Sequence, residues 1–161
     1  MTQSYQVTPI GWVQNARRTA EDDGWSAVPS TITLDPAQFG AEALAGLDAF
    51  SHAEVLFLFH AADTVHTGAR HPRGNTDWPR VGIFAQRGKD RPNRLGATIC
   101  EIRAVSGRVV EVAGLDAIDG TPVLDIKPVM SGFERRGALR EPPWAREIMA
   151  AYWHPPGAGS A

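Results

Sequence analysis

Short apolar runs separated by turn-forming residues are the feature that most constrains the fold of this chain. About seven runs of strand length are present, and Gly, Pro, Asp and Asn gather between them. They lie at 5–13, 24–34, 53–60, 81–85, 98–105, 108–113 and 123–126. Many short strands with little helix are typical of a barrel or a sandwich. We therefore predict an all-β fold, a mainly antiparallel barrel that is closed or partly open.

Two features of the strand pattern give more detailed predictions. The two-residue turn signal Ser106-Gly107 predicts a hairpin between 98–105 and 108–113. The unbroken apolar character of 53–60 predicts a strand buried on both faces. Alternation in the hairpin predicts outward-facing Glu101, Arg103 and Glu111, and inward-facing Cys100, Ile102, Ala104, Val110 and Val112.

Two short helices are also expected. Asp35, Pro36 and Gln38 have the order of a helix cap, a first helical residue and a reciprocal cap, which predicts a helix near 36–46. Two prolines open a second helix near 142–153, with an apolar face.

The length of the chain limits its organisation to one domain. With 161 residues and 43% hydrophobic content, it can bury one sizeable core. We expect a barrel domain over 1–138, a helical extension of the same domain over 139–154, and a disordered tail over 155–161.

Charge is unevenly distributed along the sequence. A net charge of −2 argues against a protein that coats nucleic acid indiscriminately. The segment Arg70–Arg94, however, holds seven basic and two acidic residues, a local charge of +5. Such a segment is either a solvated loop or an anion-binding edge.

Cysteine and histidine usage excludes several kinds of site. Cys100 is the single cysteine, so an intrachain disulfide is excluded, and the five histidines form no paired metal-binding motif. We expect no metal site. No signal-peptide pattern or bilayer-length apolar run is present, so we expect a soluble cytoplasmic protein.

Two segments combine a strand-like run with a loop rich in Gly, Pro, Asp, Asn or Arg. They read VGIFAQRGKDRPNRLG at 81–96 and GLDAIDGTPVLDIKP at 114–128. Loops of this kind cost conformational entropy to order, which favours a role in ligand binding. The Asp119-Gly120 turn exposes backbone groups and a carboxylate that could form hydrogen bonds with a ligand, and Arg87 and Arg91 could hold a ligand carboxylate. An Asp-Gly turn also needs no ligand to explain it.

These two segments resemble the TsaA-like, or TrmO, family of methyltransferases, with the second matching almost letter for letter. The resemblance implies a β-barrel that binds S-adenosylmethionine (SAM), a homodimer, and methylation of a nitrogen in a modified tRNA adenosine. The basic segment Arg70–Arg94 could hold the phosphates of such a tRNA, because local charge matters more than net charge for a docked edge. The cofactor-binding residues that the resemblance implies are Gln14, Asn15, His60, Ala61, Phe84, Ala85, Arg87, Arg91, Asn93, Ala97, Asp119, Gly120, Thr121 and Pro122.

A general base is harder to predict, because methyl transfer from a sulfonium needs no protein nucleophile. Asp125 and His60 are the candidates for a catalytic role. Each has a structural alternative: Asp125 and Lys127 could make cross-strand ion pairs on the outer face of the sheet, and His60 could be a structural histidine at a strand end.

The chain departs from the family pattern in ways that leave the acceptor open. QRGK stands at 86–89 where the family has T-R-S-P, NRLG stands at 93–96 where it has N-P-I-G, and Val129 replaces a frequent tyrosine. The sequence also stops after one helix, without the C-terminal domain of the tRNA-acting bacterial members. Three functions therefore stay open: a tRNA methyltransferase, a small-molecule methyltransferase, and a non-catalytic SAM-binding barrel.

Overall fold

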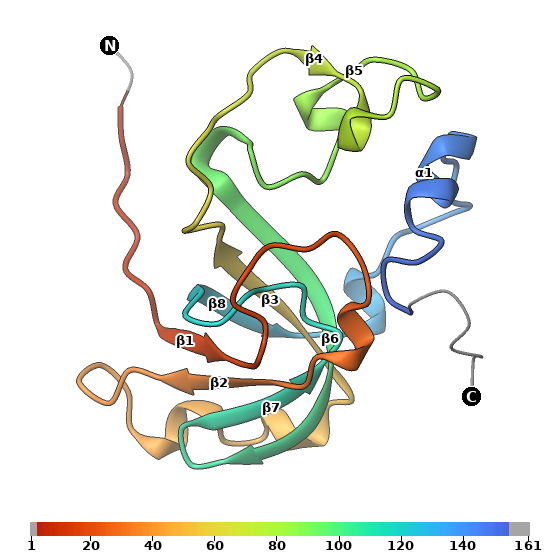
Figure 1. The fold of residues 1–161 in the computed structure, drawn as a ribbon. Helices are drawn as coiled ribbons and strands as arrows, with labels where there is room; N and C mark the ends of the chain where they lie inside the picture. The colour runs from red at the N-terminus through yellow and green to blue at the C-terminus, as the bar shows by residue number, and fades with distance from the viewer. Residues whose placement is uncertain (1–2, 155–161) are drawn as a thin grey trace.

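Six antiparallel strands close into a barrel in the computed structural model, which describes residues 3–154 (Figure 1). Their order around the barrel is β1-β2-β7-β6-β3-β8. The strands are β1 (Gly11–Gln14), β2 (Ser30–Leu34), β3 (His52–Leu58), β6 (Leu95–Ser106), β7 (Val109–Ala113) and β8 (Pro122–Pro128). The prediction of an all-β barrel is confirmed, with six barrel strands rather than seven.

The hairpin predicted around Ser106-Gly107 is formed by β6 and β7. Cys100, Val110 and Val112 are buried in the core, as their alternation predicts, and Ile102 is half-buried. Ala104 is exposed, so its predicted inward orientation is wrong. The reason is a register shift between Ile102 and Ala104, since an extra residue in one strand turns the following side chains to the other face.

Strand β3 lies in the barrel wall between its two neighbours, β6 and β8. Ala53, Val55 and Phe57 are buried, whereas the residues between them are half-buried. The prediction that this strand is buried on both faces is therefore wrong. One face contacts the core and the other faces outward, as the wall of a barrel requires.

The helix predicted near 36–46 is not formed. Asp35 does act as a cap, accepting hydrogen bonds from the Ala37 backbone N–H and the Gln38 side chain. The chain then becomes extended at Gly40 and continues as two 3-10 helices, η2 (Ala41–Leu44) and η3 (Leu47–Ala49). The cap is therefore followed by a turn, because the next residues leave the helical conformation.

Two other elements are shorter than predicted. The segment before Gly11 belongs to no strand, so the strand predicted over 5–13 begins later. The strand predicted within 24–34 is β2, which confirms that prediction, and a 3-10 helix, η1 (Trp25–Ala27), precedes it. The C-terminal helix α1 is Pro143–Ile148, because 151–153 pairs with 24–26 instead of continuing the helix. η7 (Ser131–Phe133) follows β8. The tail predicted over 155–161 lies outside the described residues.

A long excursion, residues 59–94, leaves the barrel after β3 and returns at β6; it forms the upper part of Figure 1. It contains a two-stranded sheet of β4 (Ala69–Arg70) and β5 (Val81–Gly82), so the strand predicted at 81–85 ends early. The 3-10 helices η4 (Pro72–Gly74), η5 (Ile83–Ala85) and η6 (Pro92–Arg94) complete it. The whole basic segment Arg70–Arg94 lies here.

One apolar core fills the barrel. Its largest fully buried side chains include Phe57, Ile32 and Leu115. Within residues 3–154, no helix has the length and apolar character needed to cross a bilayer.

Barrel closure depends on Gly11, where β1 pairs with both β2 and β8. A Cβ on this residue would lie 2.3 Å from the Thr33 carbonyl oxygen. We expect Gly11→Ala to lower the free energy of unfolding by about 2 kcal/mol, since backbone must move to relieve the overlap. Urea denaturation measures the loss. Gly82→Ala is the control, because a Cβ there meets no atom within 4 Å, and equal losses in both variants would contradict this explanation.

Candidate active site

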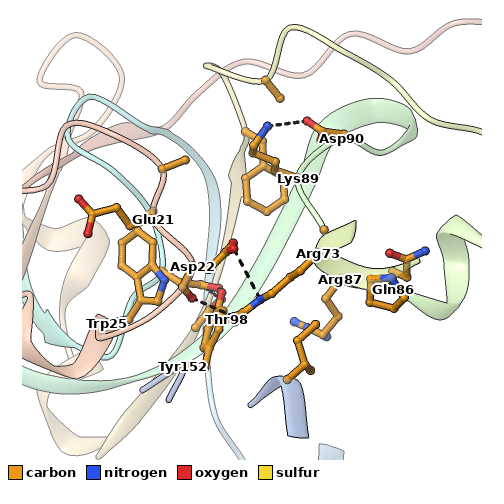
Figure 2. Close-up of a pocket in the computed structure, with 18 of the residues that line it drawn as sticks. Glu21, Asp22, Trp25, Arg73, Gln86, Arg87, Lys89, Asp90, Thr98 and Tyr152 are labelled. Atoms are coloured by element: carbon orange, nitrogen blue, oxygen red, sulfur yellow. Dashed lines mark hydrogen bonds and ion pairs between the residues drawn. The ribbon is translucent and has the colours of Figure 1, made fainter. Parts of the chain in front are cut away.

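A cavity of about 930 Å³ lies at one side of the barrel, beneath the excursion. Three parts of the chain form its walls: the barrel with its adjoining loops, the excursion, and the C-terminal segment 144–153. Figure 2 shows Trp25, Asp22, Thr98 and Tyr152 gathered on one side, and Gln86 and Arg87 on another.

The C-terminal segment is fastened to the barrel loop by backbone hydrogen bonds. The N–H groups of Gly24, Trp25 and Ser26 donate to the carbonyls of 151, 152 and 153 in turn, at 2.9–3.1 Å. Nearer the start of the segment, the Glu147 carboxylate accepts a hydrogen bond from the indole N–H of Trp78, which belongs to the excursion, at 2.7 Å. The segment is thus held both to the barrel and to the excursion, and it closes the cavity between them.

Asp116 lies in the cavity wall and accepts two hydrogen bonds from hydroxyl groups. The Thr98 hydroxyl donates to Oδ1 and the Tyr152 hydroxyl donates to Oδ2. Burial and the adjacent Asp116 carboxylate both raise the pKa of Tyr152 well above its ordinary value. Tyr152 therefore stays protonated and continues to donate.

Most other charges in the cavity wall are paired. Arg73 contacts Asp23 at 2.9 Å and Asp22 at 3.7 Å, which joins the excursion to the barrel loop. Asp90 contacts Lys89 at 2.7 Å and Arg70 at 3.4 Å. Although partial burial raises the pKa of Asp90, the hydrogen bonds and charges of its two partners outweigh it and lower that pKa overall.

Arg87 and Asp116 differ from these pairs. Among residues 3–154, neither has an oppositely charged partner within ion-pair distance. The Arg87 guanidinium donates to the carbonyl of Ala97. The Asp116 carboxylate accepts from the hydroxyl of Thr98, the residue that follows Ala97 in the sequence. The cavity thus presents an unpaired cation and an unpaired anion, each anchored to one of two consecutive residues of β6.

Some residues predicted for the cofactor site line this cavity. They are His60, Ala61, Arg87, Ala97 and Thr121. They come from the end of β3, the excursion, β6 and the turn before β8, so the fold brings together positions far apart in the sequence.

The other predicted residues lie outside the cavity lining. They are Gln14, Asn15, Phe84, Ala85, Arg91, Asn93, Asp119, Gly120, Pro122 and Asp125. Asn15 donates through its side chain to Ser30 and to the Ala117 carbonyl, while its backbone N–H donates to the Asp119 carboxylate. Arg91 donates to the Gln86 carbonyl within the excursion. These groups hold the loops that form the cavity walls.

Asp125 and Lys127 form an ion pair along β8, with both side chains partly exposed. The structural alternative predicted cross-strand ion pairs for these two residues, whereas within residues 3–154 they pair with each other along one strand, so that prediction is wrong in its partner. A catalytic role for Asp125 stays a prediction, and this position lies outside the cavity.

Several cavity residues were not predicted as site residues, chiefly Trp25, Arg73, Asp116 and Tyr152. Asp116 belongs to the GLDAIDGTP phrase, so the motif contained a signal for it. Tyr152 carried only the signal of an apolar helix face. Within residues 3–154, no cluster of three His, Cys, Asp or Glu side chains could hold a metal ion.

The sequence and the fold both match one family. Residues 18–135 match the family model described as the tRNA-methyltransferase O N-terminal domain. Two solved structures of TrmO from Pseudomonas aeruginosa superpose with TM-scores of 0.72 and 0.69, at 28% and 29% identity. The alignments cover 89% and 86% of this chain, and 63% and 62% of those chains.

Curated relatives agree with this match. The tRNA (adenine(37)-N6)-methyltransferase of Escherichia coli is 41% identical over 100 residues, 56% of this chain and 40% of its own length. The probable S-adenosyl-L-methionine-binding protein of Methanothermobacter thermautotrophicus is 33% identical over 136 residues, 82% of this chain and 95% of its own. The chain spans only 21–22% of the mouse, human and rat tRNA (adenine(37)-N6)-methyltransferases. On the family match, the fold and these relatives, the chain belongs to the TrmO family.

Proposed function

We propose that this chain is a SAM-dependent methyltransferase whose acceptor is a nitrogen of a modified adenosine in tRNA. The observation that carries the proposal is the cavity, which places an unpaired guanidinium and an unpaired carboxylate among aromatic side chains in a TrmO-family barrel. The names of the relatives supply the donor and the acceptor class.

The groups in the cavity wall fit the chemistry of SAM. A volume of about 930 Å³ is within the range of small-molecule sites. The Arg87 guanidinium suits a ligand carboxylate, and the Asp116 carboxylate suits a ligand cation. The Trp25 and Tyr152 rings line the same wall, and each already contacts a guanidinium, Arg17 at 4.3 Å and Arg73 at 5.8 Å from the ring centroid. A ligand that carries both a carboxylate and a positive charge would therefore find one complementary group for each kind of charge.

The proposed chemistry asks little of the protein beyond alignment. SAM supplies a methyl group on a good leaving group, so an in-line displacement needs no protein nucleophile. The apolar side chains of Phe57, Ile118 and Trp153 in the cavity wall would exclude water from the site. His60 lines the same cavity, which supports the proposal that it accepts the proton released by the acceptor nitrogen.

We further propose a cytoplasmic homodimer that uses the excursion to contact tRNA. Arg80 and Arg94 lie on the excursion, where they form no ion pair within residues 3–154. Such cations could contact phosphates, and binding would then weaken as salt is raised.

Transfer of labelled methyl groups tests the proposed function. The purified chain would be incubated with methyl-labelled SAM and either total tRNA or a fraction of small metabolites, and labelled products would be identified by mass spectrometry. We expect label in one modified adenosine of tRNA. Label only in small molecules would refute the tRNA acceptor, and SAM binding without any transfer would favour a non-catalytic barrel.

A further inference from the structure

Asp116 is a carboxylate with neutral partners in a partly apolar wall. Both of its hydrogen-bond donors are hydroxyl groups, and among residues 3–154 it forms no ion pair. By contrast, Asp22 and Asp90 in the same wall each contact a basic side chain. Glu54 also lines the cavity and forms no ion pair within residues 3–154, but it lies opposite Lys127 on the neighbouring strand β8. A half-buried negative charge without a cation is unfavourable, so a cationic ligand would gain free energy by approaching it.

The surroundings of Asp116 are aromatic as well as anionic. Its partner Tyr152 packs edge-to-face on Trp153, with ring centroids 5.0 Å apart. Trp25 lines the same side of the cavity as Tyr152 and Thr98 (Figure 2). Two cations already contact these rings: the Arg73 guanidinium lies 5.8 Å from the centroid of the Tyr152 ring, and the Arg17 guanidinium lies 4.3 Å from that of Trp25. Within residues 3–154, neither forms an ion pair with Asp116. What distinguishes this side of the wall is Asp116 itself, a half-buried carboxylate that forms no ion pair within residues 3–154 and that a ligand cation could therefore pair with.

We propose that Asp116 binds the positively charged sulfonium of SAM and that Tyr152 is the positioning residue that orients its carboxylate. This inference rests on the proposed function. It implies discrimination between the two forms of the cofactor, because S-adenosylhomocysteine (SAH) has lost that positive charge. Asp116 would make the cavity bind SAM more tightly than SAH, which favours release of SAH after the reaction.

Tyr152 can act on Asp116 without altering the path of the backbone. Its carbonyl accepts from the Trp25 N–H at 3.1 Å, so the backbone is held independently of the side chain. Its ring also packs on Trp153. Tyr152→Phe therefore removes the hydroxyl while these contacts persist, leaving Asp116 with Thr98 as its hydroxyl donor.

Calorimetric titration of the full chain with SAM and, separately, with SAH tests this assignment. We expect Asp116→Asn to weaken SAM binding at least about tenfold while SAH binding changes less than about threefold. Tyr152→Phe should lower the ratio of SAM affinity to SAH affinity by about three- to tenfold. The double variant should be no worse than Asp116→Asn, because Tyr152 acts through that carboxylate.

Matched controls and a second variant separate this role from a structural one. Tyr5→Phe and Asp48→Asn change the same atoms at exposed positions and should leave both affinities unchanged. Thr98→Val removes the other hydroxyl that donates to Asp116. This variant replaces Tyr152→Phe in the titrations if Tyr152→Phe does not fold.

Equal losses of SAM and SAH affinity in Asp116→Asn would overturn the sulfonium assignment. Additive losses in the double variant would overturn the positioning role of Tyr152. A folded wild-type chain that binds neither ligand would instead overturn the proposed function, and this inference with it.

Discussion

Arg87→Ala is expected to weaken SAH binding about tenfold, or about 1.4 kcal/mol. The Arg87 guanidinium lines the cavity and has no acidic partner within residues 3–154. It is therefore available for a ligand carboxylate, which SAM and SAH share, and a hydrogen bond to a charged group contributes about this much. Calorimetric titration measures the change.

Two further variants show whether the loss is specific. Arg87→Lys keeps the charge but loses the forked geometry, so an intermediate affinity is expected. Arg103→Ala removes an arginine that pairs with Glu101 on the exposed side of β6, and it should leave the affinity unchanged. An Arg87→Ala variant that binds SAH as tightly as wild type would remove Arg87 from the proposed site.

Phe57→Ala is expected to lower the free energy of unfolding by about 4 kcal/mol. The Phe57 side chain is 1% exposed and packs edge-to-face on Phe59, with ring centroids 5.2 Å apart. Its ring also fills the space in front of Gly96, where a Cβ would lie 2.4 Å from it. The truncation would leave a cavity between β3 and β6, and chemical denaturation measures the resulting loss of stability.

Phe133 provides the matched control, since its side chain is 90% exposed. Phe133→Ala should change the free energy of unfolding by less than about 0.5 kcal/mol. If the two variants lose similar stability, the packing between β3 and β6 is not what holds the barrel together.

Local sequence signals predicted the barrel well and its details less well. The hairpin at Ser106-Gly107 followed from alternation and a turn signal, both of which act between neighbouring residues. The register shift between Ile102 and Ala104 had no such signal, because it is set by pairing between β6 and β7. Likewise, the cap at Asp35 formed as predicted, but the extended conformation of Gly40 stopped the helix.

The cavity was predicted only in part for a similar reason. Arg87 belongs to a segment that resembles a known family, and the same resemblance implied His60, so the sequence pointed to both. Tyr152 reaches the cavity only because 151–153 pairs with 24–26, more than a hundred residues away in the sequence. A contact of that kind follows from the fold, and no local pattern encodes it.

Other motif residues have structural tasks that their conspicuous sequence did not reveal. The Asp119 carboxylate accepts from the backbone N–H of Asn15, and the Gly120 N–H donates to the Val13 carbonyl. Both bonds fix the turn that precedes β8 and carries Thr121 to the cavity wall. A motif can thus be shared within a family because it builds a site as well as because it contacts a ligand.

A crystal structure of the full chain with SAH tests the central claim most directly. We predict the ligand in the cavity between the barrel, the excursion and residues 144–153, with its carboxylate against Arg87. Density for the ligand outside this cavity, for example against Asn93 or beside Asp125 on β8, would contradict the account.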